Sequence, residues 1–356
     1  MYAQIFGVSL KYFQRAKIDK SWGGQIKLFS MKVLFIRFSS LGDVLLTTPI
    51  IRTFCTHFQN AEIHFLTKKQ FAPILEYNPF IDTLISFDSE NESMLQLIIR
   101  LQKEHYTHII DLHDKLRSAL IKRFVRGKVF TYKKKHNYRK KLLKDHELKP
   151  ISSTVDLYAS VLEKFALSLD EKKLDFFLPE NEEAIAASFL SSDKKIIVTI
   201  SPGTSWHTKQ YPTEYYKMII RNLLDKHDVK IVLLGTEQEK NLTTELAAVS
   251  ETKILNLCGR ISLIESAVII KHSDLFISGD CGPMHIAAAF EVPQIAIFGP
   301  THPKLGFAPL NPNAKVLTLD LDCSPCTLHG NKQCPKSHFK CMMNLSPDMV
   351  ISELSL

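Results

Sequence analysis

The chain has 356 residues, 45% of them hydrophobic and 23% charged, a balance typical of folded globular proteins rather than disordered or fibrous ones. Its length is sufficient for two domains of ordinary size, each with its own core. We find no apolar run near the roughly 18–20 residues that a membrane helix needs, which argues against a membrane-spanning protein.

Residues 1–30 do not resemble a secretory signal, because Lys11, Arg15 and Asp19 interrupt any apolar core that such a peptide would need. Since Met31 directly precedes a predicted strand, we interpret these residues as a loose extension or an over-long start assignment. The expected location is the cytoplasm, with attachment to the inner face of the membrane left open.

The net charge of +8 is unevenly distributed. Residues 122–144, KRFVRGKVFTYKKKHNYRKKLLK, contain no acidic side chain. Such a block suits an anionic partner such as lipid phosphates, a phosphorylated glycan or nucleic acid. The alternative is an ordinary solvated face of a helix or loop.

The first predicted unit is a strand over residues 32–37, a polar turn, and a helix that begins near Asp43. A strand, a turn of small residues and a helix open a doubly wound α/β domain, whose ligands bind at the carboxyl edge of the sheet. Asp43 therefore lies where a carboxylate can act on a substrate. It is equally well placed to cap the helix.

Strand and helix patterns then alternate, which predicts a parallel sheet covered on both faces. The predicted strands of the first half cover residues 61–66, 82–87, 107–113 and 128–132, and the predicted helices cover residues 68–77, 91–103, 116–125 and 154–167. A polar stretch around Pro179 gives the best domain boundary, so we expect a first domain over 31–178, a linker over 179–193 and a second domain over 194–356.

The second half repeats this rhythm, with polar residues where its predicted strands end. These are the segment SPGT that ends at Thr204, Gly235, the pair Gly279-Asp280, and residues 298–301. Gly282 and Pro283 then open a helix, whose free backbone N–H groups attract phosphate. The second half is thus expected to bind a nucleotide or a phosphate, although ordinary strand-to-helix turns also need glycine. Neither a Walker motif nor G-x-G-x-x-G is present.

Four segments in order carry a family resemblance: RFSSLGDVLLTTPIIR, SPGTSWHTKQYP, SGDCGPMHIAAAF and PQIAIFGPT. They resemble glycosyltransferase family 9, the ADP-heptose:lipopolysaccharide heptosyltransferases, and the likeness extends from Met31 to the end of the chain. The resemblance implies a GT-B fold, in which two Rossmann-like α/β domains face each other across a cleft. It also implies that the first domain binds the acceptor and the second the nucleotide sugar.

The resemblance also implies roles for individual residues. Asp43 matches the expected general base, and Lys209 a lysine that contacts the donor phosphates. Glu239 matches a glutamate that holds the ribose or adenine side of the donor nucleotide. Asp280 matches an aspartate that contacts the transferred heptose. The remaining donor-binding residues that it implies are Thr204, Cys281, Gly282, Pro283 and His285. Two positions depart from the family pattern, because Cys281 replaces a threonine or serine and Tyr211 replaces a tryptophan.

On this basis we expect an inverting, metal-independent transfer of heptose from ADP-heptose to a lipid-linked anionic acceptor, the lipopolysaccharide inner core. The expected acceptor-binding residues are Ser39, Ser40, Lys68, Arg117 and Arg123. The alternatives are another nucleotide sugar or glycan acceptor, a nucleotide-binding protein without turnover, and a nucleic-acid-binding protein. The last lacks a recognisable binding motif, so no nucleic-acid partner is expected.

Four of the seven cysteines, Cys323, Cys326, Cys334 and Cys341, lie within 19 residues near the end of the chain. A C-x₂-C pair with two further thiols is compatible with a structural zinc or iron site. Because disulfides are disfavoured in the cytoplasm, the alternative is reduced thiols without a ligand. No cofactor is expected to be required for catalysis.

Overall fold

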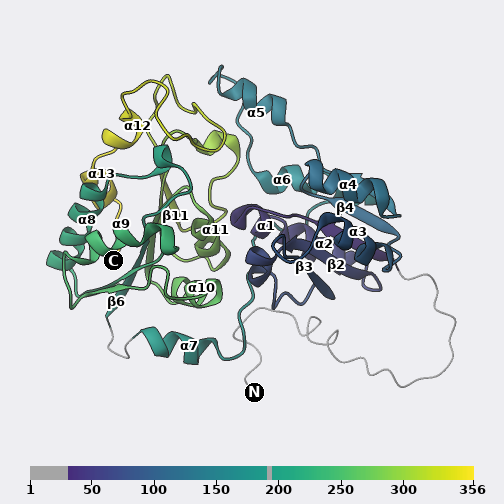
Figure 1. The fold of residues 1–356 in the computed structure, drawn as a ribbon. Helices are drawn as coiled ribbons and strands as arrows, with labels where there is room; N and C mark the ends of the chain where they lie inside the picture. Colours follow the sequence, from purple (N-terminus) through teal and green to yellow (C-terminus); the bar gives the residue numbers. More distant parts are fainter. Residues whose placement is uncertain (1–30, 191–194) are drawn as a thin grey trace.

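The computed structural model describes residues 31–190 and 195–356, which form two α/β domains side by side (Figure 1). The prediction for residues 1–30 lies outside the described residues. Among the described helices, none combines the length and apolar character needed to cross a bilayer.

The first domain contains a parallel sheet in the order β3-β2-β1-β4-β5. β1 lies at its centre, and Phe35 of β1 is aligned with Phe65 of β2 and Ile110 of β4. The strands are β1 (Lys32–Ile36), β2 (Glu62–Lys68), β3 (Thr83–Phe87), β4 (His108–Asp111) and β5 (Lys128–Thr131). The helices are α1 (Leu41–Leu45), α2 (Thr48–His57), η3 (Lys69–Ile74), α3 (Met94–Gln102), α4 (Leu116–Phe124), α5 (His136–Leu142), α6 (Thr154–Ala159) and η4 (Leu162–Phe165).

The second domain contains a parallel sheet in the order β11-β10-β9-β6-β7-β8. Its strands are β6 (Ile196–Ser201), β7 (Val229–Leu233), β8 (Ile254–Asn256), β9 (Leu275–Gly279), β10 (Gln294–Ile297) and β11 (Ala314–Leu317). Its helices are α7 (Glu182–Phe189), η5 (His207–Lys209), α8 (Thr213–Lys226), η6 (Glu237–Glu239), α9 (Lys240–Ala247), α10 (Leu263–Lys271), α11 (Gly282–Ala289), η7 (Pro303–Leu305), α12 (Lys340–Met343) and α13 (Pro347–Ile351).

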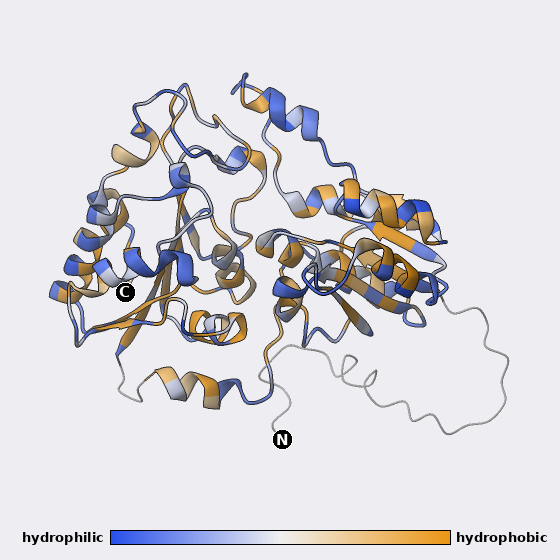
Figure 2. Cartoon of the chain, viewed as in Figure 1, coloured by the Kyte–Doolittle hydropathy of each residue, from blue (hydrophilic) through white to orange (hydrophobic). Residues whose placement is uncertain are grey.

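The predicted α/β class with doubly wound parallel sheets is confirmed, because every strand pair among the described residues is parallel. The apolar side chains gather on these strands and on the helix faces that cover them, whereas α5 is largely hydrophilic (Figure 2). The predicted linker contains α7, which packs on α10 of the second domain. Lys271 of α10 forms an ion pair with Glu182 of α7 at 2.6 Å.

Two predicted helices differ from the structure. Residues 68–77 contain only the 3₁₀ helix η3, because Pro73 lacks the N–H that an α-helix interior would use. Residues 154–167 are divided into α6 and η4. The hydroxyl of Ser160 donates to the carbonyl of Leu157 at 2.6 Å, a local bond that competes with the helical ladder.

The two domains contact each other through α1 and α11. One apolar cluster extends across this contact, from Val44 and Leu45 of α1 to Ile286 and Ala287 of α11. A Cβ atom on Gly42 would lie 2.5 Å from the imidazole of His285, closer than packed atoms come. The absence of a side chain at Gly42 thus allows α1 to lie directly against α11.

Candidate active site

Asp43 lies in α1 at the carboxyl edge of the first sheet, where it both caps the helix and faces the other domain. Its Oδ2 accepts hydrogen bonds from the hydroxyl of Ser40 at 2.8 Å and from the backbone N–H of Ser40 at 3.2 Å. The predicted cap is therefore present. It does not exclude a chemical role, because the side chain of Asp43 remains 19% exposed.

The other carboxylate oxygen of Asp43 is held by two residues that the sequence interpretation missed. Arg37, just after β1, approaches Oδ1 with Nη2 at 2.8 Å. Tyr158 of α6 donates its hydroxyl to the same oxygen at 3.2 Å. Burial opposes ionisation of Asp43, but the charge of Arg37 and the hydrogen bonds from Ser40 outweigh it, so the pKa of Asp43 falls to about 2. The carboxylate is thus ionised at neutral pH.

In the second domain, Lys209 and Asp280 form an ion pair between Nζ and Oδ2 at 2.8 Å. Thr301, after β10, donates its hydroxyl to the same oxygen at 2.6 Å. Thr204 packs beside them, since a Cβ on Gly279 would lie 3.1 Å from its methyl group. An ammonium group has three N–H donors, so Lys209 can contact a phosphate without leaving Asp280.

Glu239 follows β7, at the carboxyl edge of the second sheet. Its Oε2 accepts from the backbone N–H of Thr236 at 2.7 Å and from the Thr236 hydroxyl at 2.5 Å. A Cβ on Gly203 would lie only 2.2 Å from Cγ of Glu239, so the two segments are in close contact. The structure therefore places Thr204, Lys209, Glu239 and Asp280 at one edge of the second domain, and their role in donor binding stays a prediction.

Helix α11 begins beside this group. Cys281 is its N-cap residue without a side-chain capping bond, and Pro283 occupies its first turn. His285 is buried between the domains, and its Nδ1 has no hydrogen-bond partner among the described residues. Burial lowers the pKa of His285 to about 4, while the charges of Asp280 and Asp43 oppose that shift. The imidazole is therefore neutral at pH 7 and is within electrostatic range of both domains' carboxylates.

The predicted acceptor-binding residues are only partly brought together. Ser39 and Ser40 form the turn before α1, and Lys68 ends β2, with its N–H donating to the carbonyl of Phe38 at 3.3 Å. Arg117 is exposed in the first turn of α4. Arg123 lies in the last turn of α4, away from this edge, because a helix of nine residues spans roughly 13 Å.

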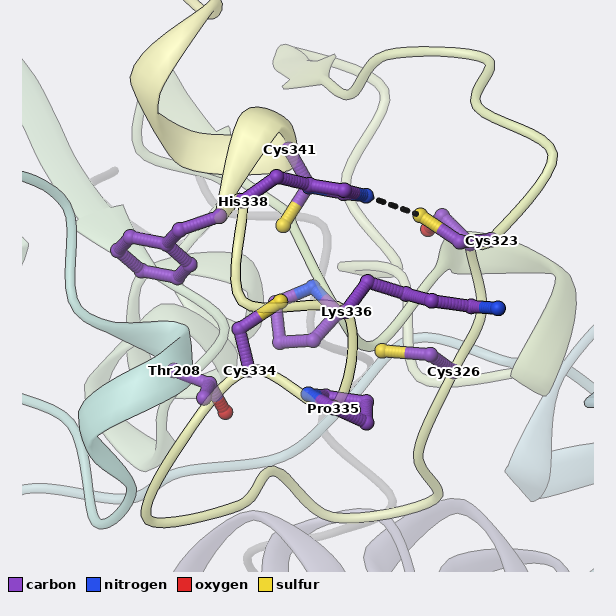
Figure 3. Close-up of a pocket in the computed structure, with 11 residues that line it drawn as sticks. Thr208, Cys323, Cys326, Cys334, Pro335, Lys336, His338 and Cys341 are labelled. Atoms are coloured by element: carbon purple, nitrogen blue, oxygen red, sulfur yellow. Dashed lines mark hydrogen bonds between the residues drawn. The ribbon is translucent and has the colours of Figure 1, made fainter.

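The four clustered cysteines line a cavity of about 10 Å³, the lower limit for one water molecule (Figure 3). All are free thiols, and His338 Nε2 lies 3.8 Å from Sγ of Cys323. Within residues 31–190 and 195–356, no group of three or more His, Cys, Asp or Glu side chains is arranged to hold a metal ion. The predicted structural zinc or iron at Cys323, Cys326, Cys334 and Cys341 is therefore not supported by the described residues.

The loop that carries these cysteines nevertheless reaches the site. Thr208 of η5 accepts a hydrogen bond from the N–H of Asn331 at 2.8 Å, and its own hydroxyl donates to the Asn331 carbonyl at 3.0 Å. These bonds fix the turn that presents Lys209. His329, two residues earlier, is exposed and within electrostatic range of Lys115, Asp43 and Lys209. Sequence reasoning missed His329, since only the cysteines of this loop form a recognisable pattern.

Comparisons with known proteins identify the family of this chain. The sequence profile of glycosyltransferase family 9 (heptosyltransferase) matches residues 94–338. The chain is 29% identical to lipooligosaccharide heptosyltransferase 2 of Campylobacter jejuni, over 91% of this chain and 97% of that protein. It is 28% identical to lipopolysaccharide heptosyltransferase 1 of Campylobacter coli, over 76% of this chain and 84% of that protein.

Solved structures show the same fold. A family 9 glycosyltransferase from Veillonella parvula superposes with a TM-score of 0.74 at 21% identity, over 92% of this chain and 97% of the other. The ADP-heptose lipopolysaccharide heptosyltransferase II of E. coli superposes with a TM-score of 0.71 at 22% identity, over 91% of this chain and 97% of that chain. The chain therefore belongs to glycosyltransferase family 9 (heptosyltransferase), and it is a glycosyltransferase with the GT-B fold.

Proposed function

We propose that the protein transfers heptose, with inversion, from ADP-heptose to an acceptor sugar of the lipopolysaccharide core. The observation that carries the proposal is the arrangement at the domain contact. The ionised carboxylate of Asp43 lies on one side, and Lys209, Asp280 and the start of α11 lie on the other. The names of the relatives support heptose as the sugar and lipopolysaccharide or lipooligosaccharide as the acceptor.

In this mechanism Asp43 accepts the proton of the acceptor hydroxyl as that oxygen attacks the anomeric carbon. The bond from the sugar to the diphosphate breaks, and its electron pair leaves with ADP. Proton transfer to a positioned carboxylate typically contributes about 10²–10⁴-fold in rate. Lys209 and the backbone N–H groups at Gly282 would stabilise the charge that develops on the diphosphate. These residues can do so without a metal ion, which we propose is not required.

A donor screen tests the choice of nucleotide sugar. Purified protein is incubated with a core-oligosaccharide acceptor and, separately, with ADP-heptose and with UDP-, GDP- and CMP-sugars, and the products are measured by mass spectrometry. We expect transfer from ADP-heptose alone. Transfer from a UDP-sugar without transfer from ADP-heptose would contradict the heptose assignment.

We further propose that the protein works at the cytoplasmic face of the inner membrane, where a lipid-linked anionic acceptor would be available. The cationic segment around β5 and α5 supports this proposal: Lys133 is 61% exposed, and α5, which is largely hydrophilic (Figure 2), carries the exposed Lys140 and Lys141 in its last turn. We expect salt-sensitive binding to vesicles that contain anionic lipids and no binding to neutral vesicles. Binding to oligonucleotides but not to vesicles would favour the nucleic-acid alternative.

A further inference from the structure

Helix α4 presents apolar side chains to solvent, whereas a helix that covers a sheet normally has a polar outer side. Leu116, Leu120 and Phe124 recur at every fourth position, so they form one stripe along the helix. Their exposed fractions are 78%, 37% and 53%. The opposite side of α4 is already packed, because Ile121 and the C-cap residue Val125 belong to the apolar cluster beneath the helix. The stripe is therefore a second apolar side of α4.

Helix α3 extends this surface, because it lies beside α4 and also exposes apolar side chains (Figure 1). Leu95 and Ile99, one turn apart, are 67% and 45% exposed. Gln102 lies on the same side of α3 as Ile99, and its side chain donates to the carbonyl of Phe124 at 3.0 Å. This bond joins the two stripes into one surface. The outer apolar face, as we call it, consists of Leu95, Ile99, Leu116, Leu120 and Phe124. Single exposed apolar residues are ordinary, but a group on neighbouring helices marks an interaction site.

The charge around the outer apolar face is positive. Residues 94–103 and 115–144, which include both helices, contain no Asp or Glu. The guanidinium of Arg123 lies 5.9 Å from the centre of the Phe124 ring, and Arg126 is exposed just beyond the helix. Neither arginine has an anionic partner among the residues that the structure describes. Apolar side chains bordered by unpaired cations match a lipid surface, in which anionic phosphates overlie hydrocarbon.

The outer apolar face begins at the sheet edge that carries Asp43. Leu116 lies four residues after Leu112, whose carbonyl accepts a hydrogen bond from Nη1 of Arg37 at 2.6 Å. The other terminal nitrogen of Arg37 holds Asp43 at 2.8 Å. From this end, the nine residues of α4 carry the stripe away from the site for roughly 13 Å. A membrane against this face would therefore hold a lipid-linked acceptor with its sugar near the carboxylate.

We propose that the outer apolar face docks on an anionic lipid bilayer, with Leu116, Leu120 and Phe124 entering the boundary between headgroups and acyl chains. This inference rests on the proposed function, because it names the surface through which the enzyme reaches its lipid-linked acceptor. Arg123, which the sequence suggested for acceptor binding, contacts lipid phosphates instead, together with Arg126. A second copy of this chain fits the face less well, because two such faces would bring unpaired arginines together.

The first test measures cosedimentation of the full-length protein with vesicles of equal parts phosphatidylglycerol and phosphatidylethanolamine. The double variant Leu116→Ser, Phe124→Ser should bind about 10–100-fold more weakly than wild type, because two apolar side chains no longer enter the lipid. The matched control is Met218→Ser, Met343→Ser, which removes two exposed apolar side chains from the second domain and should bind like wild type. Equal binding by the two double variants would overturn the inference.

The arginines are tested in the same assay. Arg123→Gln and Arg126→Gln should each weaken vesicle binding by about fivefold, the effect of one cation near an anionic surface. Arg221→Gln, which alters an exposed arginine of α8 in the second domain, is the control and should bind like wild type. If all three variants bound like wild type, the assignment of the arginines to lipid phosphates would fail.

A fluorescence measurement tests whether the side chains enter the lipid. After subtraction of the wild-type signal, the tryptophan in Phe124→Trp should be quenched by vesicles with brominated acyl chains, and the one in Met218→Trp should not. Equal quenching in both variants, or none in Phe124→Trp, would contradict insertion. Light scattering tests the other occupant: a change from dimer to monomer in Leu116→Ser, Phe124→Ser with vesicle binding unchanged would show that the face joins two copies.

Activity with ADP-heptose separates this inference from the proposed function. With a water-soluble core oligosaccharide, Leu116→Ser, Phe124→Ser should transfer as fast as wild type, which also shows that the variant is folded. With the lipid-linked acceptor in vesicles, its rate below saturation should fall about tenfold or more, in line with its weaker membrane binding. No transfer by wild type to either acceptor would defeat the proposed function. Equal transfer by wild type and variant to the lipid-linked acceptor would defeat only the inference.

Discussion

The two domains each contribute one partly buried ion pair to the site, and the two pairs are built differently. In the first domain, Asp43 and Arg37 belong to the same strand-turn-helix unit, and Ser40 and Tyr158 complete the shell around the carboxylate. In the second, Lys209 and Asp280 follow different strands, and Thr301 adds one hydrogen bond. The first pair is enclosed and fixed, which suits a group that must hold one orientation. The second leaves donors of Lys209 free for a ligand.

The largest effect is expected from Asp43→Asn, which keeps the size of the side chain but removes the proton acceptor. Transfer should fall by about 10²–10⁴-fold, while ADP binding, measured by calorimetry, should stay unchanged because it depends on the second pair. The control is Asp88→Asn, which alters another ion-paired carboxylate of the same domain. Wild-type transfer in Asp43→Asn would break the assignment of chemistry to the first pair.

Lys209→Met should show the opposite pattern, with ADP binding as the property most affected. Loss of one ionic hydrogen bond to a phosphate corresponds to about 10–100-fold in affinity. Lys217→Met serves as the control, because Lys217 of α8 pairs with Glu214 of α8 and with Glu245 of α9 rather than with Asp280. An unchanged affinity for ADP in Lys209→Met would show that the second pair does not bind the donor.

The glycine contact between the domains can be tested separately from either ion pair. In Gly42→Ala the new methyl group would lie 2.5 Å from His285, whereas in Gly282→Ala it would lie 3.0 Å from Cβ and Cδ2 of Leu41. We expect Gly42→Ala to lower the free energy of unfolding by about 1–3 kcal/mol through overpacking, and Gly282→Ala to cost less. The measurement is urea unfolding of both variants. A stability of Gly42→Ala equal to that of the wild type would mean that α1 and α11 are not closely packed at Gly42.

The smallest expected effect is the dependence of folding stability on pH. The pKa of Asp43 is lower in the folded protein than its ordinary value of 3.8, so its contribution to stability is present above that pH and is lost as pH falls through about 2. The shift corresponds to roughly 2 kcal/mol. Urea unfolding of wild type and Asp43→Asn should therefore show a stability difference that shrinks by about 1–2 kcal/mol between pH 6 and pH 2.5. A constant difference would contradict the strong ion pair with Arg37.

Sequence patterns predicted the parallel sheets well, because strands buried on both faces appear as short continuous apolar runs. The strand-end residues Asp43, Lys209 and Asp280 could be placed because parallel topology brings strand ends to one edge. The pairing of Lys209 with Asp280 could not be predicted, since both were expected to contact substrate. The contact between Tyr158 and Asp43 joins residues 115 positions apart, and nothing local in the sequence indicates it.

Other differences have local physical causes. The sequence shows residues 122–144 as one cationic block, but the structure divides it. Lys122 pairs with the buried carboxylate of Asp111 at 2.7 Å and Arg139 is buried, whereas Lys140 and Lys141 of α5 are exposed. The cysteine spacing favours a metal site, yet the described residues include no group of three or more side chains arranged to hold a metal ion. Spacing limits which side chains can meet, but only the path of the loop determines whether they do.

The central claim is that Asp43 activates the acceptor for a single direct displacement at the anomeric carbon. The most direct measurement is the configuration of the new glycosidic bond, determined by NMR of the product made from ADP-heptose. Direct displacement predicts that this configuration is opposite to that of the donor. Retention of the donor's configuration would require a second displacement step and would contradict the role assigned to Asp43.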